Sequence, residues 1–236
     1  FDMRLIDLFK GMDKKKLTLK MQIRQEYYRV KELLDGKRPS RMDLFTYMDD
    51  EIYRICVSGS HAKENPFQHY LDFLYELGEL SEDEQKLYAG IGREFIQTIE
   101  TTEMQKVYKM PILYSFYNHG NIRLAVTDEE VLESWKEFFD TGTNWKDFPN
   151  VNTYEDYKKV TDKQHLSKAK RMPIRFLKAS GKGFFVEKDG YALALRDEIG
   201  EVVGNMAFGE QMGDVLGYRS LEYYRRRYEK KSLMLF

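Results

Sequence analysis

Basic and aromatic side chains are interleaved near the end of this 236-residue chain, and this mixture is suited to binding a ligand. The stretch holds Arg219, Tyr223, Tyr224, Arg225, Arg226, Arg227 and Tyr228. Arginines bind phosphates and aromatic rings stack on bases, so the pattern is typical of nucleic-acid-binding surfaces. The same residues have a second interpretation, in which the tyrosines are core and the arginines extend from a closing helix into solvent. The sequence leaves both interpretations open.

Further basic residues could extend such a surface. Arg123, Lys182 and Lys188 lie on two predicted hairpins, where the wing of a winged-helix domain would contact a nucleic-acid backbone. Lys14, Lys15 and Lys16 are consecutive, within a stretch from Lys10 to Arg41 that has eleven Lys/Arg and four Asp/Glu. A run of this kind is either a solvated tail or a surface that faces phosphates.

Motifs for catalysis, nucleotides and metals are missing from the sequence. Residues 180–183, Ser-Gly-Lys-Gly, imitate part of a phosphate-binding loop. Gly183 stands where a Ser or Thr must hold Mg²⁺, however, and Phe176 replaces the first glycine. The histidines are scattered and do not form a zinc-binding cluster: His61, His69, His119 and His165. We therefore predict no catalytic residue, no metal and no cofactor in this chain, and no enzymatic activity of its own.

The elements that position these residues centre on residues 108–139. An apolar run, Met110–Tyr117, is followed by turn residues and by a strand-like alternation that ends at Val126. Thr127 and Glu130 then form a capping box ahead of a helix whose apolar face carries Trp135 and Phe139. We predict that both rings are buried, against Ile112 and Phe116. Four more capped helix starts are expected at Ser40–Asp43, Ser81–Glu84, Thr153–Asp156 and Thr161–Gln164.

Residues 171–203 echo residues 108–139, since each segment has a basic residue followed by Met-Pro-Ile, an apolar run and a glycine turn. The echo is either an internal duplication or a coincidence in a Met- and Phe-rich chain. Asp189–Gly190 between two apolar runs predicts a hairpin. The predicted fold class is α+β, with a mostly helical region over 1–105 and a mixed region over 106–236. The mixed region would hold two short hairpin or winged-helix-like units.

Composition limits the partners. The formal net charge is −1, so the chain has no global attraction for nucleic acid, and any binding must come from local clusters. No apolar run approaches the ~20 residues of a membrane span. A single cysteine, Cys56, and the lack of a signal peptide favour the cytoplasm.

Four short series carry a resemblance to a known family: residues 38–53 (RPSRMDLFTYMDDEIY), 92–96 (GREFI), 108–112 (YKMPI) and 218–228 (YRSLEYYRRRY). Together they resemble the C-terminal region of large bacterial superfamily II helicases, the DEAD/DEAH-box, restriction-type proteins common in Firmicutes. The resemblance spans nearly the whole chain. It implies upstream motor domains that bind ATP and Mg²⁺, and the start at Phe1 fits a fragment of such a protein. No ATP-binding motif of the family is present, so no catalytic residue is carried over.

Two functions follow as hypotheses. The first is a non-catalytic accessory region of a superfamily II helicase that binds or positions DNA or RNA for the motor domains. The second is a protein–protein interaction module that contacts the motor domains or another subunit. Convergence of basic charge on one face would favour the first, and dispersal would favour the second.

Overall fold

The computed structural model describes the backbone of residues 17–233 and the side chains of residues 17–228. The chain forms two compact units that divide between Glu79 and Leu80. Residues 17–105 contain helices and no strand, and the strands of the described chain all come later. The change of structural class expected near residue 105 thus falls inside the second unit.

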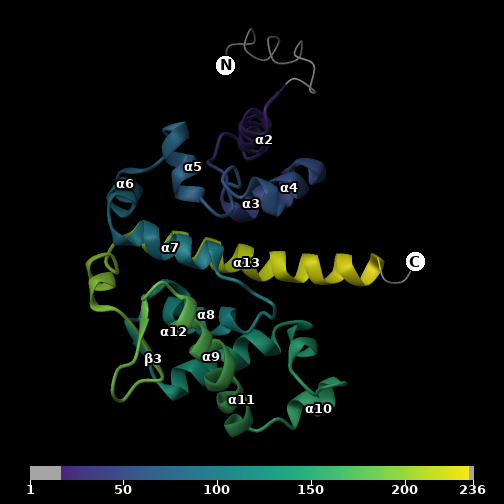
Figure 1. The fold of residues 1–236 in the computed structure, drawn as a ribbon, viewed down its shortest axis with the longest axis vertical. Coiled ribbons are helices and arrows are strands. Elements are labelled where there is room, and N and C mark those ends of the chain that lie inside the picture. The colour runs from purple at the N-terminus through teal and green to yellow at the C-terminus, as the bar shows by residue number, and fades with distance from the viewer. Residues whose placement is uncertain (1–16, 234–236) are drawn as a thin grey trace. The chain divides into compact units, whose positions relative to one another are not determined.

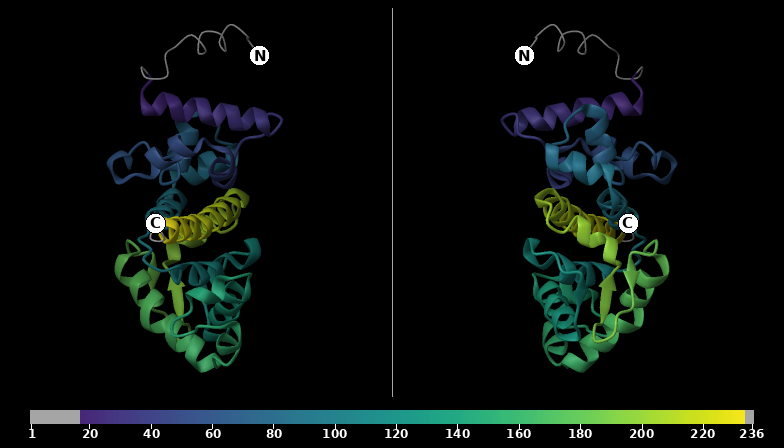
Figure 2. Two further views of the ribbon diagram at one scale, coloured as in Figure 1. Left: turned by 90° about the vertical axis from the view of Figure 1, so that its right-hand side faces the viewer. Right: turned by 90° about the vertical axis from the view of Figure 1, so that its left-hand side faces the viewer.

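The first unit is a small helical cluster of α2 (Leu19–Leu33), α3 (Arg41–Tyr47), α4 (Asp50–Val57), the 3₁₀ turn η2 (Gly59–His61) and α5 (Tyr70–Leu77). Helix α2 lies across α3 and α4, as the side views show (Figure 2). Its buried stripe meets apolar residues of the other helices and of the loop before α5, and the core includes Ile23, Tyr27, Val30, Leu44, Tyr53, Phe67 and Leu74. Gly78 ends α5 in the left-handed conformation, as its position in the sequence predicts.

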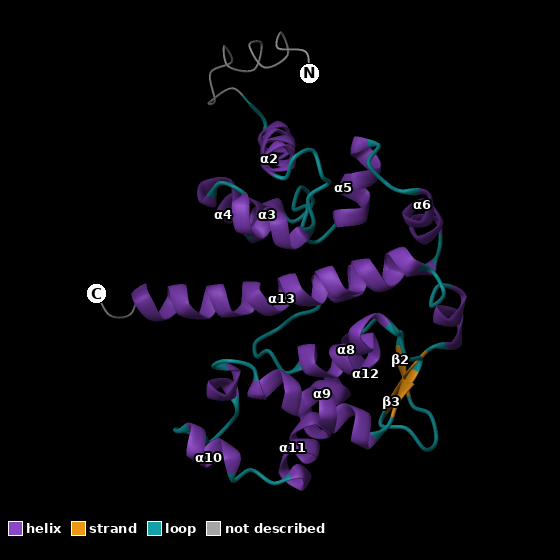
Figure 3. Ribbon diagram, turned by 180° about the vertical axis from the view of Figure 1, so that it is seen from behind, coloured by secondary structure: helices purple, strands orange, loops and turns teal. Residues whose placement is uncertain are grey.

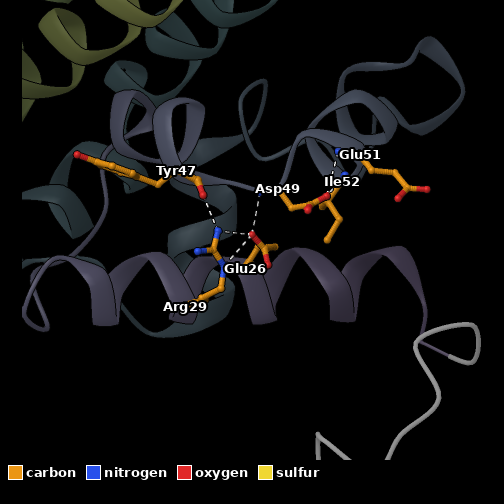
Figure 4. A network of polar contacts seen from close by, with 6 residues as sticks. All are labelled: Glu26, Arg29, Tyr47, Asp49, Glu51 and Ile52. Carbon is orange, nitrogen blue, oxygen red and sulfur yellow. Dashed lines mark hydrogen bonds and ion pairs between the residues drawn. The ribbon is translucent and has the colours of Figure 1, made fainter.

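A polar network fastens α2 to the link between α3 and α4 (Figure 4). Glu26 forms an ion pair with Arg29 at 2.7 Å and accepts from the backbone N–H of Asp49 at 2.9 Å. The Arg29 guanidinium also donates to the carbonyl of Tyr47. Asp49 is the N-cap of α4, since its Oδ1 accepts from the N–H groups of Glu51 and Ile52. The carboxylate of Asp49 therefore stabilises the start of α4.

The second unit is larger. Its helices are α6 (Glu82–Ala89), α7 (Ile91–Thr101), α8 (Lys109–Tyr117), α9 (Asp128–Asp140), α10 (Tyr154–Lys158), α11 (Asp162–Ala169), α12 (Arg175–Ser180) and α13 (Met206–Leu233). Short helical turns lie between them: η3 (Asn118–Gly120), η4 (Asn144–Asp147), η5 (Lys170–Ile174) and η6 (Asp197–Glu201). The long helix α13 packs on α6, α7 and α8 and runs beside α7 (Figure 1). Phe95 of α7, Phe116 of α8 and Phe208 of α13 itself are fully buried in the core of this unit.

One small antiparallel sheet completes the second unit (Figure 3). Its strands β1 (Ala125–Val126), β2 (Phe185–Val186) and β3 (Leu193–Leu195) have the order β1-β3-β2. Phe185 pairs with Leu195, so the hairpin predicted around Asp189–Gly190 is confirmed. Val126 pairs with Leu193, so the first segment supplies one strand to this sheet and forms no hairpin of its own. The prediction of two separate hairpin units was therefore wrong: the described residues form one hairpin, β2–β3, and β1 joins the same sheet.

All five predicted helix starts are confirmed. Ser40, Ser81, Thr127 and Thr161 each form a full capping box with the residue three positions later, and Thr153 accepts from the N–H of Asp156. The predicted burial in α9 is also confirmed, because Trp135 and Phe139 are fully buried. The Trp135 ring centroid lies 5.8 Å from that of Tyr108 and 5.0 Å from that of Phe139, and Phe139 also contacts the ring of Phe148. Ile112 and Phe116 are buried as well, and their contact with these two rings stays a prediction.

The two Met-Pro-Ile segments differ in structure. Pro111 is the third residue of α8, where its missing N–H would have had no helical partner. Pro173 instead lies inside a longer helical segment, since α11, η5 and α12 follow one another with right-handed helical dihedrals at their junctions. The π-helical turn η5 accommodates this proline. After the strands the segments differ again, because β1 leads into α9 whereas β3 leads into the short turn η6.

Across the described residues, the helices are too short or too polar to cross a membrane.

Candidate functional site

The arginines at the end of α13 are largely occupied within the chain. Arg226 forms an ion pair with Glu222, and Arg227 forms one with the buried Asp147. Arg219 is 8% exposed, lies 3.7 Å from Glu222 and donates to the carbonyl of Thr102. Burial lowers the pKa of Arg219. These side chains fasten α13 to its neighbours, so they offer little free charge to a phosphate.

The tyrosines of α13 belong mainly to the packing. Tyr218 and Tyr223 are buried, and Tyr223 donates to Asp147 at 3.1 Å. Burial raises the pKa of Tyr223 to about 12. Tyr108 donates to the backbone carbonyl of Asp147 at 2.7 Å, so Asp147 joins α13, η4 and the start of α8. For this helix the structure favours the second interpretation, with core tyrosines and structural arginines.

The remaining predicted residues are dispersed. Arg123 forms an ion pair with Glu130 at 3.0 Å and donates to the carbonyl of Ser115, which fixes the segment before β1. Lys188 is exposed in the β2–β3 loop, with its ammonium 5.6 Å from the centroid of the Tyr191 ring. Lys14, Lys15 and Lys16 lie outside the described residues.

Lys182 is placed differently from the other predicted residues. The Ser-Gly-Lys-Gly sequence forms a turn from α12 into β2, so a helix precedes it and a strand follows. A phosphate-binding loop has the opposite order, with the phosphate at the start of a following helix. Lys182 and Gly183 both have positive φ, +50° and +78°. The turn exposes the Lys182 side chain, which forms no ion pair with any described residue.

Lys182 ends a basic stretch that follows α11, η5 and α12. Residues 163–186 hold seven Lys/Arg and no Asp or Glu. Arg171 and Arg175 lie four residues apart in η5 and α12, and Lys182 follows in the turn after α12. All three are exposed, and none of them pairs with an acid in the described part of the chain. We call these three residues and the exposed Met172 and Phe176 the α12 basic face. Met172 is 36% exposed and Phe176 is 40% exposed, so apolar groups accompany the charges.

A cavity of about 440 Å³ adjoins this face within the second unit. It lies between the end of α7, the link to α8, and η5–α12, and its walls include Thr102, Glu103, Lys106, Lys109, Met172, Phe176, Ser180 and Lys182. This volume is within the ~300–1,000 Å³ range of small-molecule sites. The cavity and the α12 basic face share Met172, Phe176 and Lys182.

Lys109 is the most unusual residue of this cavity. It is 9% exposed, and its ammonium donates to the hydroxyls of Thr102 at 3.0 Å and of Ser180 at 3.4 Å. No Asp or Glu within residues 17–228 forms an ion pair with it. Burial lowers the pKa of Lys109; the charge of Glu103 opposes this effect, and that of Arg219 adds to it.

The histidines and acids form no metal site in the part of the chain that the structure describes, since no three His, Cys, Asp or Glu side chains come together there. His165 lies in an aromatic cluster, with its ring centroid 4.9 Å from that of Phe148. Cys56 is buried on α4, and burial raises the pKa of its thiol to about 12.

Comparisons with protein-family models, with curated proteins and with solved structures found no match to this chain.

The structure brings one predicted basic residue, Lys182, into the wall of this cavity. Lys106, Lys109, Arg171, Arg175 and Phe176 were not predicted. One signal for part of this set was present in the sequence, namely the 24 residues from 163 to 186 that lack any acid. No comparable signal marked Lys109, because its burial and its lack of a carboxylate partner arise from the packing of α7, α8 and α12.

Proposed function

We propose that this chain is a non-catalytic accessory region that binds single-stranded nucleic acid through the α12 basic face. One observation carries the proposal: exposed Phe176 and Met172 lie among three basic side chains that have no acidic partner in the described chain. Non-specific single-strand binding combines these two features, because cations track the backbone and aromatic rings stack on unpaired bases. A duplex buries the faces of its bases, so it would use the charges and leave Phe176 without a partner.

The resemblance of the sequence to superfamily II helicases supports a role beside helicase motor domains. The exposure of the α12 basic face supports its use as the binding surface. In this context the chain would hold a strand for upstream motor domains, which would supply ATP hydrolysis. The β2–β3 hairpin would act as a winged-helix-type wing, because β2 packs against α12 and Lys188 is exposed in the hairpin loop. ATP turnover by the pure chain, abolished by a point change within it, would contradict the non-catalytic role.

The test is a fluorescence-anisotropy titration with single- and double-stranded DNA and RNA at ~50 mM salt and upwards. The variant replaces Arg171, Arg175 and Lys182 together with alanine. Each phosphate contact on a single strand contributes about 0.7 to the slope of log affinity against log salt. Loss of three contacts should therefore lower the slope by about 2. Phe176→Ala should weaken single-strand binding and leave the salt slope unchanged.

The matched control replaces Lys86, Lys158 and Lys159, which changes the net charge equally but removes lysines that already pair with Asp83, Glu155 and Asp156. This control should bind as the unmodified chain does. Equal weakening in both triple variants would indicate a general charge effect and contradict the interface. If no nucleic acid binds at tens of micromolar, the interaction module becomes the better account. Exposed Tyr28, Leu33 and Tyr47 in the first unit favour that second function.

A further inference from the structure

Lys109 is 9% exposed, and its ammonium forms no ion pair with an acid of the described residues. Lysine is almost never fully buried unless it is paired, because an unpaired charge in a low-dielectric interior is costly. The hydroxyls of Thr102 and Ser180 accept hydrogen bonds from Lys109 but do not neutralise it. Since Lys109 also lines the cavity, an anion inside the cavity could supply the missing charge.

The other walls define the kind of anion. Lys106, Lys109 and Lys182 face one acid, Glu103, so the lining has an excess of two positive charges. A phosphomonoester carries about −1.5 to −2 charges near pH 7, which matches this excess better than a carboxylate does. Phe176 and Met172 form an apolar wall, and an exposed aromatic ring is suited to stacking on a planar base.

We infer that this cavity binds a phosphomonoester joined to a planar base. The ligand is either a free nucleoside monophosphate or the phosphorylated end of a nucleic-acid strand. The phosphate oxygens accept from Lys109, with Lys106 and Lys182 beside it, and the base stacks on Phe176. The strand-end form rests on the proposed function, whereas the free-nucleotide form does not.

Calorimetric titration of the full chain tests the inference with matched ligand pairs. One pair is adenosine 5′-monophosphate and adenosine, and the other is a short oligonucleotide with and without a terminal phosphate at either end. The phosphorylated member of at least one pair should bind at least about tenfold more tightly, the effect of one charge-assisted hydrogen bond. Lys109→Met should remove this preference. Lys136→Met should keep it, because Lys136 pairs with Asp162 and does not line the cavity.

A pH series separates a direct contact from a structural role. Because burial lowers the pKa of Lys109, the phosphate preference should decline on the alkaline side. Arginine remains charged there, so Lys109→Arg should retain the preference to higher pH. If the unmodified chain and Lys109→Arg lost the phosphate preference at the same pH, direct contact between the phosphate and the Lys109 ammonium would be contradicted.

The outcomes distinguish this inference from the proposed function. If oligonucleotides bind regardless of a terminal phosphate and adenosine 5′-monophosphate does not bind, the inference fails and the proposed function stands. Binding of adenosine 5′-monophosphate alone supports the inference and contradicts the proposed function. Binding of inorganic phosphate as tight as that of the nucleotide would overturn the role of Phe176. If no ligand binds, both proposals fail.

Discussion

His165 is a buried imidazole, and we expect it to make the stability of the second unit depend on pH. It is 2% exposed, its Nδ1 has no hydrogen-bond partner among the described residues, and its ring packs against Phe148 and Tyr157. Burial lowers its pKa, Lys136 lowers it further, and Asp162 and Asp140 oppose the shift. The unfolded chain, with a histidine pKa near 6.5, therefore takes up this proton at a higher pH than the folded chain does.

The sign of the effect follows from linkage. At about pH 7.5 and above the imidazole is neutral in both states and stability is not affected. As the pH falls below that value the unfolded state binds the proton first, so stability is lost until the folded pKa is passed. We predict that His165→Gln loses less stability than the unmodified chain between about pH 7.5 and pH 5, measured by urea unfolding at each pH. His119→Gln removes an exposed histidine and is the control; if it gave the same change as His165→Gln, burial would not be the cause.

Trp135 is a large buried residue of α9, the helix that packs on α8. Its ring is fully buried, and the adjacent Ser134 donates to the carbonyl of Pro111 at 2.8 Å. Trp135→Ala removes a large ring from a closed site and should lower the free energy of unfolding by about 3–5 kcal/mol. Chemical denaturation measures this loss. Trp145→Ala, at a half-buried ring in η4, should cost clearly less, and equal costs would contradict the difference in burial.

At the scale of elements, the turn that joins α12 to β2 is closely packed around Gly181. A methyl group on Gly181 would lie 2.5 Å from the carbonyl oxygen of Leu177 and 2.4 Å from the Phe185 ring. Leu177 is a backbone neighbour that accepts from the Gly181 N–H and cannot simply rotate away. Gly181→Ala should therefore cost about 1–3 kcal/mol and displace Lys182, which weakens nucleic-acid binding.

Gly204→Ala is the matched control for this element. A methyl group there meets nothing within 4 Å and φ is not positive, so stability and binding should both be unchanged. Thermal unfolding and the anisotropy titration measure the two effects. Unchanged stability in Gly181→Ala would show that the turn can relax, and the predicted loss of binding would then have no basis.

The local elements were predictable because their causes are local in the sequence. Ser81 and Glu84 satisfy each other's backbone groups across three residues, and Asp189–Gly190 turns between two apolar runs. The pairing of β1 with β3 was not predictable in this way, because it joins Val126 to Leu193, far apart in the sequence. The π-helical turn at Pro173 was missed for a similar reason. The same Met-Pro-Ile starts a helix at Pro111, and only the preceding α11 makes the second case different.

The candidate site was predictable only in part. Lys182 was identified from its predicted hairpin, but the sequence left open whether the arginines of α13 are free to bind a ligand or belong to the packing. Arg227 pairs with Asp147, and the sequence separation of 80 residues leaves no local sign of this pairing. Lys109 becomes a candidate binding residue only when its burial is known, because the sequence alone does not distinguish it from an exposed lysine. Tertiary packing thus decides which basic residues remain available to a ligand.

At the scale of the whole molecule, each unit has its own core and its own polar ties. Lys31 forms an ion pair with Glu79 at 2.6 Å, and Arg38 donates to the Glu79 carbonyl at 3.0 Å, so the last residue of the first unit is held by that unit. The second unit contains the whole sheet, the α12 basic face and the cavity. Gln211 on α13 donates to the buried Glu84 of α6 at 2.7 Å, which ties its last helix to its first.

These ties predict that residues 80–236 fold without residues 1–79. The shorter chain should unfold in one cooperative urea transition, and it should bind single-stranded nucleic acid with the affinity and salt slope of the full chain. Residues 1–79 alone should be less stable, because a smaller chain buries a smaller share of its surface. Circular dichroism and the anisotropy titration measure the two properties. A non-cooperative transition of residues 80–236 would show that the second unit depends on the first, whereas cooperative folding with lost binding would place part of the interface in residues 1–79.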